Sequence, residues 1–283
     1  MGEIAFVNGR FMPLDEAVVP IEDRGFQFAD GVYEVIATYG GEPFALKPHF
    51  DRLERSLAAL SLSLDINAYG LEALMREGLE YAGFDETLVY IQITRGVAPR
   101  HHEFPTTSVD PTVVMTFKRL YRIPQAHYER GIAVISTPDE RWQRCDIKTI
   151  ALLPNVLAKQ QARTAGAFEA LLVDGQGRVT EGSSTSVFCV VDGTVYTAPE
   201  GSHILPSITR GQLLELAREL GLPVVEDFQT LEEFKAADEV FLAGTTTEAM
   251  PVVRIDDTVI GAGVPAPITL KLREAFLAKA VTP

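Results

Sequence analysis

The sequence has few cysteines, and their positions exclude two common kinds of stabilising centre. Cys145 and Cys189 are the only two among 283 residues, and neither belongs to a Cys-x-x-Cys pair. A disulfide framework or a structural zinc site needs closely spaced cysteines or several metal ligands. We therefore expect free thiols, no disulfide framework and no metal site. The neighbours His101, His102 and Glu103 do not change this, because adjacent side chains rarely converge on one ion.

The sequence also lacks long apolar runs and an excess of positive charge. No uninterrupted apolar stretch approaches the roughly 20 residues that cross a bilayer, and the first three residues open no basic and apolar signal sequence. With 39 acidic against 25 basic side chains, the formal net charge is −14 and repels phosphate at long range. We expect no nucleic-acid or membrane partner, and a cytoplasmic location.

Length and composition favour an enzyme with two lobes. The chain is 46% hydrophobic, its mean hydropathy is +0.09, and helical patterns alternate with strand patterns. Its length exceeds what one hydrophobic core usually organises. Because the basic stretch before residue 125 ends in Ile123-Pro124, we predict an N-terminal domain over residues 1–120, a linker over 121–125 and a C-terminal domain over 126–283.

Hydrophobic periodicity predicts the elements of the first domain that position chemistry. Residues 32–39 are typical of a strand, in which Tyr33 and Glu34 point to opposite faces. Pro48 suits the first turn of a helix, which places Arg52 near the N-terminal end of that helix. A strand and a helix in this order would bring both side chains to one part of the domain.

Two separated charged residues could form a covalent catalytic centre. Lys148 lies in a mostly apolar neighbourhood, and a desolvated lysine amine attacks a carbonyl to form a Schiff base near neutral pH. Glu181 could keep a pyridine nitrogen protonated, which makes pyridoxal phosphate an electron sink. Taken singly, the two are better explained as a surface lysine and a turn glutamate, because charged side chains are mostly exposed.

Six dispersed segments change this interpretation, and their order and spacing agree with one family. They are EDRGFQFADGVYEV (22–35), HFDRL (49–53), TRG (94–96), PRHH (99–102), RCDIK (144–148) and TEGSS (180–184). Over nearly its whole length the chain resembles the fold-type IV pyridoxal-phosphate enzymes, and within them the D-amino-acid transaminases. The resemblance implies an α+β fold with two domains, a small α/β sandwich at the N-terminus and a larger C-terminal pseudo-barrel that binds pyridoxal 5'-phosphate.

The resemblance also implies which residues hold the cofactor. Lys148 would carry it covalently and move the substrate proton, and Glu181 would pair with the ring nitrogen. Helix N-termini bind phosphate through unpaired N–H groups, and an arginine adds a bidentate cationic fork. The remaining cofactor contacts implied by the family are Arg52, Leu205, Ile208, Thr209, Gly244 and Thr245. Capping would explain the threonines taken alone.

Two positions depart from the family pattern. Ser186 stands where asparagine is common, and Gly244 stands where serine is common. The second departure removes a hydroxyl from the expected phosphate site. We expect both to affect cofactor affinity rather than the chemistry of the lysine and the carboxylate.

A loop over residues 97–107 is predicted to choose the substrate. An α-carboxylate needs a cationic fork and further donors, which Arg100, His102 and the Tyr33 hydroxyl supply. In the family that the chain resembles, the Arg-x-His pair reaches across a homodimer interface to bind that carboxylate. Without the resemblance, the same residues would be interpreted as a solvated surface loop.

These residues lead to one functional hypothesis with four alternatives. The leading one is a ping-pong transaminase that uses a D-amino acid (D-alanine or D-glutamate) and a 2-oxo acid (2-oxoglutarate or pyruvate) as a homodimer. The alternatives are an (R)-selective amine transaminase, a branched-chain L-amino-acid transaminase, an aminodeoxychorismate lyase, and a cofactor-binding protein without catalysis. The predicted carboxylate site argues against the amine activity as the main one.

Overall fold

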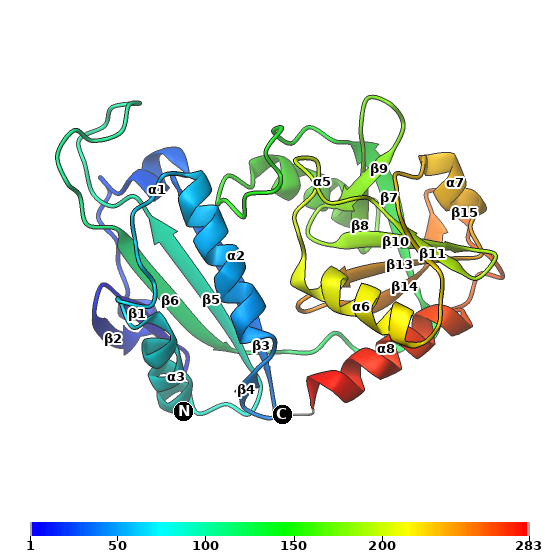
Figure 1. Cartoon of the computed structure of the whole chain (residues 1–283), viewed down its shortest axis with the longest axis horizontal. Helices are drawn as coiled ribbons and strands as arrows, with labels where there is room; N and C mark the ends of the chain where they lie inside the picture. Colours follow the sequence, from blue (N-terminus) through cyan, green and yellow to red (C-terminus); the bar gives the residue numbers. More distant parts are fainter. Residues whose placement is uncertain (1, 282–283) are drawn as a thin grey trace. The chain divides into compact units, whose positions relative to one another are not determined.

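The chain folds into two units, and each unit contains one β-sheet. The computed structural model describes residues 2–281. The first unit contains the chain up to Tyr121 together with Ile147–Ala151, and the second contains Arg122–Asp146 and the chain from Leu152 onward. Figure 1 shows a sheet with its helices in each unit.

The sheet of the first unit has six antiparallel strands in the order β2-β1-β6-β5-β3-β4. Alternating apolar residues bury one face of its long central strands. The strands are β1 (Ile4–Val7), β2 (Arg10–Pro13), β3 (Gly31–Tyr39), β4 (Glu42–Pro43), β5 (Thr87–Thr94) and β6 (Thr112–Arg119), and a 3-10 turn, η1 (Leu14–Glu16), follows β2.

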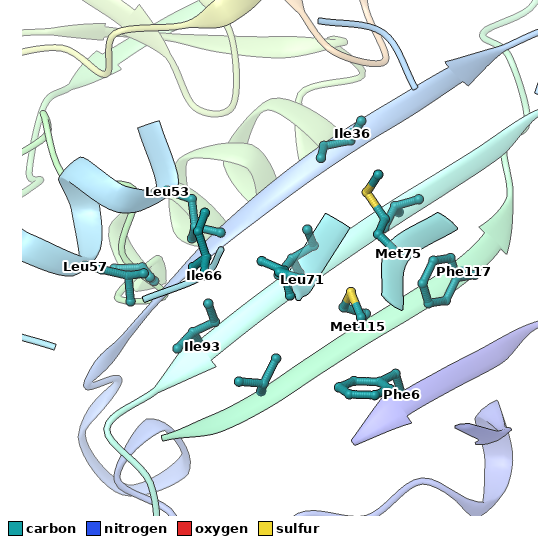
Figure 2. Close-up of a cluster of buried hydrophobic side chains, with 14 of the residues drawn as sticks. Phe6, Ile36, Leu53, Leu57, Ile66, Leu71, Met75, Ile93, Met115 and Phe117 are labelled. Carbon is teal, nitrogen blue, oxygen red and sulfur yellow. The ribbon is translucent and has the colours of Figure 1, made fainter. Parts of the chain in front are cut away.

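Two amphipathic helices cover the apolar face of this sheet. α2 (Leu46–Ala59) packs on β3, and α3 (Leu71–Ala82) packs on β1 and β6. Figure 2 shows the side chains of the resulting core, in which Leu53 and Leu57 of α2 and Met75 of α3 meet the strands. A short third helix, α1 (Arg24–Phe28), precedes β3. The core holds α2 against β3.

The sheet of the second unit has nine strands and mixes parallel with antiparallel pairs. Its order is β12-β11-β10-β13-β14-β7-β8-β9, with β15 beside β14. The strands are β7 (Ile132–Pro138), β8 (Glu169–Val173), β9 (Val179–Gly182), β10 (Ser186–Val191), β11 (Thr194–Thr197), β12 (Val224–Glu226), β13 (Glu239–Gly244), β14 (Glu248–Ile255) and β15 (Thr258–Val259). The sheet is curled, as Figure 1 shows.

Five helices belong to the second unit, and two of them pack on each other and on the sheet. α6 and α8 are in contact, and both also contact β13. The helices are α4 (Gln125–Arg130), α5 (Leu153–Thr164), α6 (Ile208–Glu219), α7 (Leu231–Ala236) and α8 (Pro267–Ala280). No helix within residues 2–281 is both long and apolar enough to cross a membrane.

The mixed α and β class predicted from the sequence is confirmed. The strand predicted over residues 32–39 is β3, and Pro48 is the third residue of α2. The short helices α1, α4 and α7 were not predicted, because five or six residues are too few to show a helical period.

A close helix-to-sheet contact makes one glycine essential to the first unit. A methyl group at Gly78 of α3 would overlap the ring of Phe117 on β6, whereas one at Gly211 of α6 would meet nothing within 4 Å. We expect Gly78→Ala to lower the free energy of unfolding by about 1–3 kcal/mol through overpacking. Gly211→Ala should instead raise it, by up to about 1 kcal/mol, because alanine is the better helix former.

Urea denaturation followed by circular dichroism measures both changes. If Gly78→Ala instead raised the free energy of unfolding, α3 would not pack as closely on Phe117 of β6 as the structure shows.

Candidate active site

The segment Ile147–Ala151 lies along an open edge of β3. Because β4 pairs only with the far end of β3, the first residues of that strand have one edge available for hydrogen bonding. The backbone N–H of Tyr33 donates to the carbonyl of Lys148 (2.9 Å), and that of Ile150 donates to the carbonyl of Gly31 (3.1 Å). The candidate nucleophile is therefore held by a strand of the sheet.

Packing and one side-chain hydrogen bond reinforce this pairing. Ile147 is buried in the core of the first unit, and the backbone N–H of Lys148 donates to Ser56 Oγ of α2 (3.3 Å). A Cβ atom at Gly31 would lie 2.7 Å from the Ile93 carbonyl oxygen of β5 and 3.1 Å from Ile150 Cδ1. The close packing of β3 against both segments therefore needs glycine at this position. Lys148 is half-buried, and its Nζ lies 4.2 Å from the centre of the Tyr33 ring.

Arg52 is held by a buried carboxylate on the face of β3 opposite to Tyr33. Its Nε donates to Glu34 Oε1 (2.7 Å) and its Nη2 donates to Glu34 Oε2 (2.8 Å), so the pair is bidentate. His49 Nδ1 lies 2.8 Å from Glu34 Oε2. All three side chains are buried. A single carboxylate thus fixes the guanidinium on α2.

The charges in this cluster are set by burial and by Arg52. Burial opposes ionisation of Glu34, but the hydrogen bonds and charge of Arg52 outweigh it and lower the pKa of Glu34 to about 2. Burial also lowers the pKa of His49, against the effect of Glu34. At neutral pH His49 is therefore uncharged and donates its Nδ1–H to the carboxylate.

Glu181 in the second unit is paired with an arginine that the sequence analysis missed. Glu181 lies on β9, is buried, and accepts a hydrogen bond from Arg141 Nη1 through Oε2. Asp139 orients this arginine from the other side, with Oδ1 accepting from Nε (2.9 Å) and Oδ2 from Nη2 (2.8 Å). Thr180 Oγ1 in turn donates to Asp139 Oδ2 (2.7 Å).

Burial raises the pKa of Glu181 above its ordinary value even though Arg141 lowers it. One cation is therefore not enough to offset the desolvation of this carboxylate. A second positive group, such as a protonated pyridine nitrogen, would lower the pKa of Glu181 and favour its charged form. This property fits the ring nitrogen of pyridoxal phosphate, and it supports the role that the resemblance gives Glu181.

Leu205 lies beside Glu181, and Ile208 and Thr209 follow it along the chain at the start of α6. The backbone N–H of Leu205 hydrogen-bonds to Glu181. Three residues later α6 begins, with Ser207 as its N-cap and the Ser207 hydroxyl accepting from the backbone N–H of Arg210 (3.3 Å). The first N–H groups of a helix point outward at its positive end, which is where a phosphate binds.

Gly244 and Thr245 open the turn between β13 and β14, and a buried threonine connects this turn to the Glu181 strand. A methyl group at Gly244 would lie 3.6 Å from Thr185 Cγ2, and one at Gly182 would overlap Thr185 Oγ1. The hydroxyls of Thr185 and Ser186 are both buried, and neither has a hydrogen-bond partner in the described structure. Buried hydroxyls are normally satisfied, so this neighbourhood suits a ligand rich in acceptors.

Arg100 and His102 lie on the exposed loop of the first unit. The guanidinium carbon of Arg100 is 4.9 Å from the centre of the Phe28 ring, and the His102 ring is 5.6 Å from the same ring. Tyr33 instead packs against Tyr90, at 5.7 Å between ring centres. Within residues 2–281 no hydrogen bond or ring contact joins Tyr33 to Arg100 or His102.

Three residues of the candidate site were not predicted, and the sequence carries a recognisable pattern for one of them. Glu34 is the one charged residue on a strand face that also carries Val32, Ile36 and Thr38, and that pattern could have marked it as the partner of a buried cation. Arg141 and Thr185 lie beside the quoted segments and follow no periodic pattern. Their roles depend on side-chain contacts that only the folded chain reveals.

The two units together carry the kinds of group that a pyridoxal-phosphate enzyme needs: a half-buried lysine, a buried carboxylate, a fixed arginine and a helix N-terminus. The chain belongs to the amino-transferase class IV family, whose profile matches residues 31–255. It is therefore an aminotransferase that depends on pyridoxal phosphate, and the predicted resemblance to fold-type IV enzymes is confirmed.

Relatives and solved structures agree on this family. The D-alanine aminotransferase of Staphylococcus haemolyticus is 42% identical over 96% of this chain and 95% of its own. That of Bacillus licheniformis is 41% identical over 95% of this chain and 94% of its own. The branched-chain amino acid aminotransferase of Escherichia coli superposes with a TM-score of 0.90 at 26% identity, covering 98% of this chain and 94% of that one.

The buried Glu34 makes stability depend on pH in a defined window. Its pKa in the folded chain, about 2, is below the ordinary value of 4.5. The contribution of its charge is therefore complete above about pH 5 and is lost as the pH falls towards 2. We expect Glu34→Gln to lower the free energy of unfolding at pH 7 by about 3 kcal/mol, since a pKa lowered by one is worth about 1.4 kcal/mol.

Urea unfolding of both proteins between pH 7 and pH 2 measures the difference. The difference in the free energy of unfolding between wild type and Glu34→Gln should become smaller as the pH falls. The exposed Glu16→Gln variant should match the wild type at every pH. A difference that stays constant down to pH 2 would contradict a charged Glu34.

Proposed function

We propose that this chain is a D-amino-acid:2-oxoacid transaminase, with D-alanine or D-glutamate as the amino donor and pyruvate or 2-oxoglutarate as the acceptor. The observation that carries the proposal is the identity of about two residues in five with D-alanine aminotransferases over almost the whole chain. Arg100 and His102, which pack on one ring, provide cationic and polar groups for a substrate carboxylate.

Each predicted site residue has a part in this proposal. Arg52, the N-terminus of α6 at Ile208 and Thr209, and the turn at Gly244 and Thr245 would hold the phosphate. Leu205 would pack against the ring. When bound, pyridoxal phosphate supplies a carbonyl carbon that takes up an amino group and a ring that withdraws electrons from the substrate Cα.

Lys148 and Glu181 would do the proton chemistry. The Lys148 amine would move a proton between the substrate Cα and the cofactor carbon that takes up the amino group, since the pairing with β3 keeps the amine in place. Glu181, held by Arg141, keeps the ring nitrogen protonated. Tyr33, beside the Lys148 amine, would contribute its hydroxyl to the substrate carboxylate.

A second candidate is a branched-chain L-amino-acid transaminase. The observation in its favour is the superposition on the branched-chain enzyme of Escherichia coli. Identity with the D-alanine enzymes is higher, so we rank this candidate second.

We also propose that the active form is a homodimer in the cytoplasm. Two segments of the first unit are joined by a β-bridge between Asp23 and Val97. They expose large apolar side chains, among them Ile21 (77%), Phe26 (72%) and Phe104 (54%). A patch of this kind on a monomer usually marks an interface. A second copy would cover it and could bring Arg100 and His102 to the site of its partner. The two free, buried thiols are usual in a reducing compartment.

The oligomer is tested by sedimentation of the wild type and of the double variant Ile21→Asp/Phe26→Asp. We expect a dimeric wild type and a mainly monomeric variant that has lost transaminase activity but keeps its far-ultraviolet circular dichroism. The matched control is Val225→Asp/Val259→Asp, which places two charges on exposed valines of the second unit. A monomeric, active wild type would contradict the dimer.

The function is tested by the visible spectrum of the cofactor-loaded protein without any acceptor. D-alanine should bleach the band of the lysine-bound cofactor and release pyruvate, and L-leucine should not. Glu181→Gln should bind the cofactor but lower kcat by roughly 100-fold or more, the scale of a lost electrostatic group in a buried site. Bleaching by L-leucine alone would move the assignment to the branched-chain enzymes.

A further inference from the structure

Arg24 holds the backbone of the loop that carries Arg100 and His102. Its Nη1 donates to the carbonyl of His101 (2.7 Å) and to that of Glu103 (3.4 Å), and its Nη2 donates to the carbonyl of His102 (3.4 Å). One guanidinium thus spans three consecutive peptide units. The loop is otherwise exposed, so these hydrogen bonds restrain a segment that has little packing of its own.

The side chain of Arg24 is itself held in place by an ion pair with Asp30. This side chain is 3% exposed, and its Nε donates to Asp30 Oδ2 (2.8 Å). Asp30 is also held by Arg95, through Nε (2.8 Å) and Nη2 (2.9 Å). Arg95 continues the restraint, because its guanidinium carbon lies 3.6 Å from the centre of the Phe104 ring at the end of the same loop.

The helix that carries Arg24 is also the platform for the two loop side chains. Phe28 of α1 lies 4.9 Å from the guanidinium carbons of both Arg24 and Arg100, and it makes an edge contact with the His102 ring. α1 is seated firmly, because its N-cap Asp23 accepts from Gly25 N (2.8 Å) and from Thr94 Oγ1 (3.0 Å). One turn of helix therefore positions both the backbone and the side chains of the loop.

We propose that Arg24 is a positioning residue for substrate recognition: it sets the geometry of the Arg100 to His102 loop and so the affinity for the substrate carboxylate. This rests on the proposed function, in which that loop binds the carboxylate. Arg24 contacts neither Lys148 nor any residue assigned to the cofactor in the described structure. Its removal should weaken binding of the amino acid and the oxo acid alike, without changing the proton transfer.

The test compares Arg24→Met and Arg24→Lys with the wild type. Loss of Arg24 does not leave a buried charge unpaired, because Arg95 still holds both oxygens of Asp30. We expect Arg24→Met to raise KM for D-alanine and for pyruvate roughly 10–100-fold, the scale of a charge-assisted hydrogen bond, with kcat and the dissociation constant of pyridoxal phosphate unchanged within about threefold. Arg24→Lys, which keeps one donor group, should fall between.

Hydrogen–deuterium exchange gives a second readout that needs no activity. The peptide over residues 97–106 should exchange faster in Arg24→Met, while the peptide over Ile147–Ala151 should not change. Arg119→Met is the matched control, since Arg119 also lies over a ring of the first unit, that of Phe84 at 4.8 Å, and is exposed.

Two results would overturn the inference: unchanged loop exchange in Arg24→Met, or faster exchange with an unchanged KM for D-alanine. A wild type that does not take an amino group from D-alanine would overturn the proposed function instead. In that case the exchange of residues 97–106 still decides whether Arg24 restrains the loop.

Discussion

The backbone pairing between Ile147–Ala151 and the first residues of β3 is the constraint on which the rest of the structure depends. Two main-chain hydrogen bonds fix the segment of Lys148 to the sheet of the first unit. The residues that precede and follow this segment in the sequence belong to the second unit. The same strand presents Tyr33 beside the lysine amine on one face and Glu34 to α2 on the other. Strand geometry, rather than side-chain rotamers alone, therefore sets the spacing between Lys148 and the groups around it.

Each buried carboxylate of the candidate site is matched to an arginine, and the two pairs differ in a useful way. Glu34 receives a full bidentate pair from Arg52, and the pKa of Glu34 falls to about 2, so that cluster is complete by itself. Glu181 shares Arg141 with Asp139, and burial still raises the pKa of Glu181, so that cluster favours one more cation. Buried ion pairs contribute little net stability on average. We infer that both pairs are kept for what they position: a guanidinium for phosphate in the first case and a carboxylate for a ring nitrogen in the second.

Part of this picture could be read from the sequence, and the limit has a physical cause. The long elements β3, α2 and α6 follow hydrophobic periods, and the six dispersed segments point to the family, which the comparisons confirm. The helix α1 is too short to show a period, yet its Arg24 and Phe28 contact the loop over residues 97–107. Arg141 and Thr185 act through contacts between elements distant in sequence, and no local pattern encodes such contacts. The attachment of Ile147–Ala151 to the first unit depends on an edge that only the assembled sheet leaves open.

The most direct test of the account is to identify the lysine that carries the cofactor. The protein is loaded with pyridoxal phosphate, reduced with borohydride so that the cofactor becomes permanently attached, digested, and mapped by mass spectrometry. We expect one modified position, Lys148, in the wild type, and no stoichiometric modification in Lys148→Ala. Stoichiometric attachment to a different lysine, such as Lys159 beside Glu169, would contradict the proposal that Lys148, which pairs with the edge of β3, is the nucleophile.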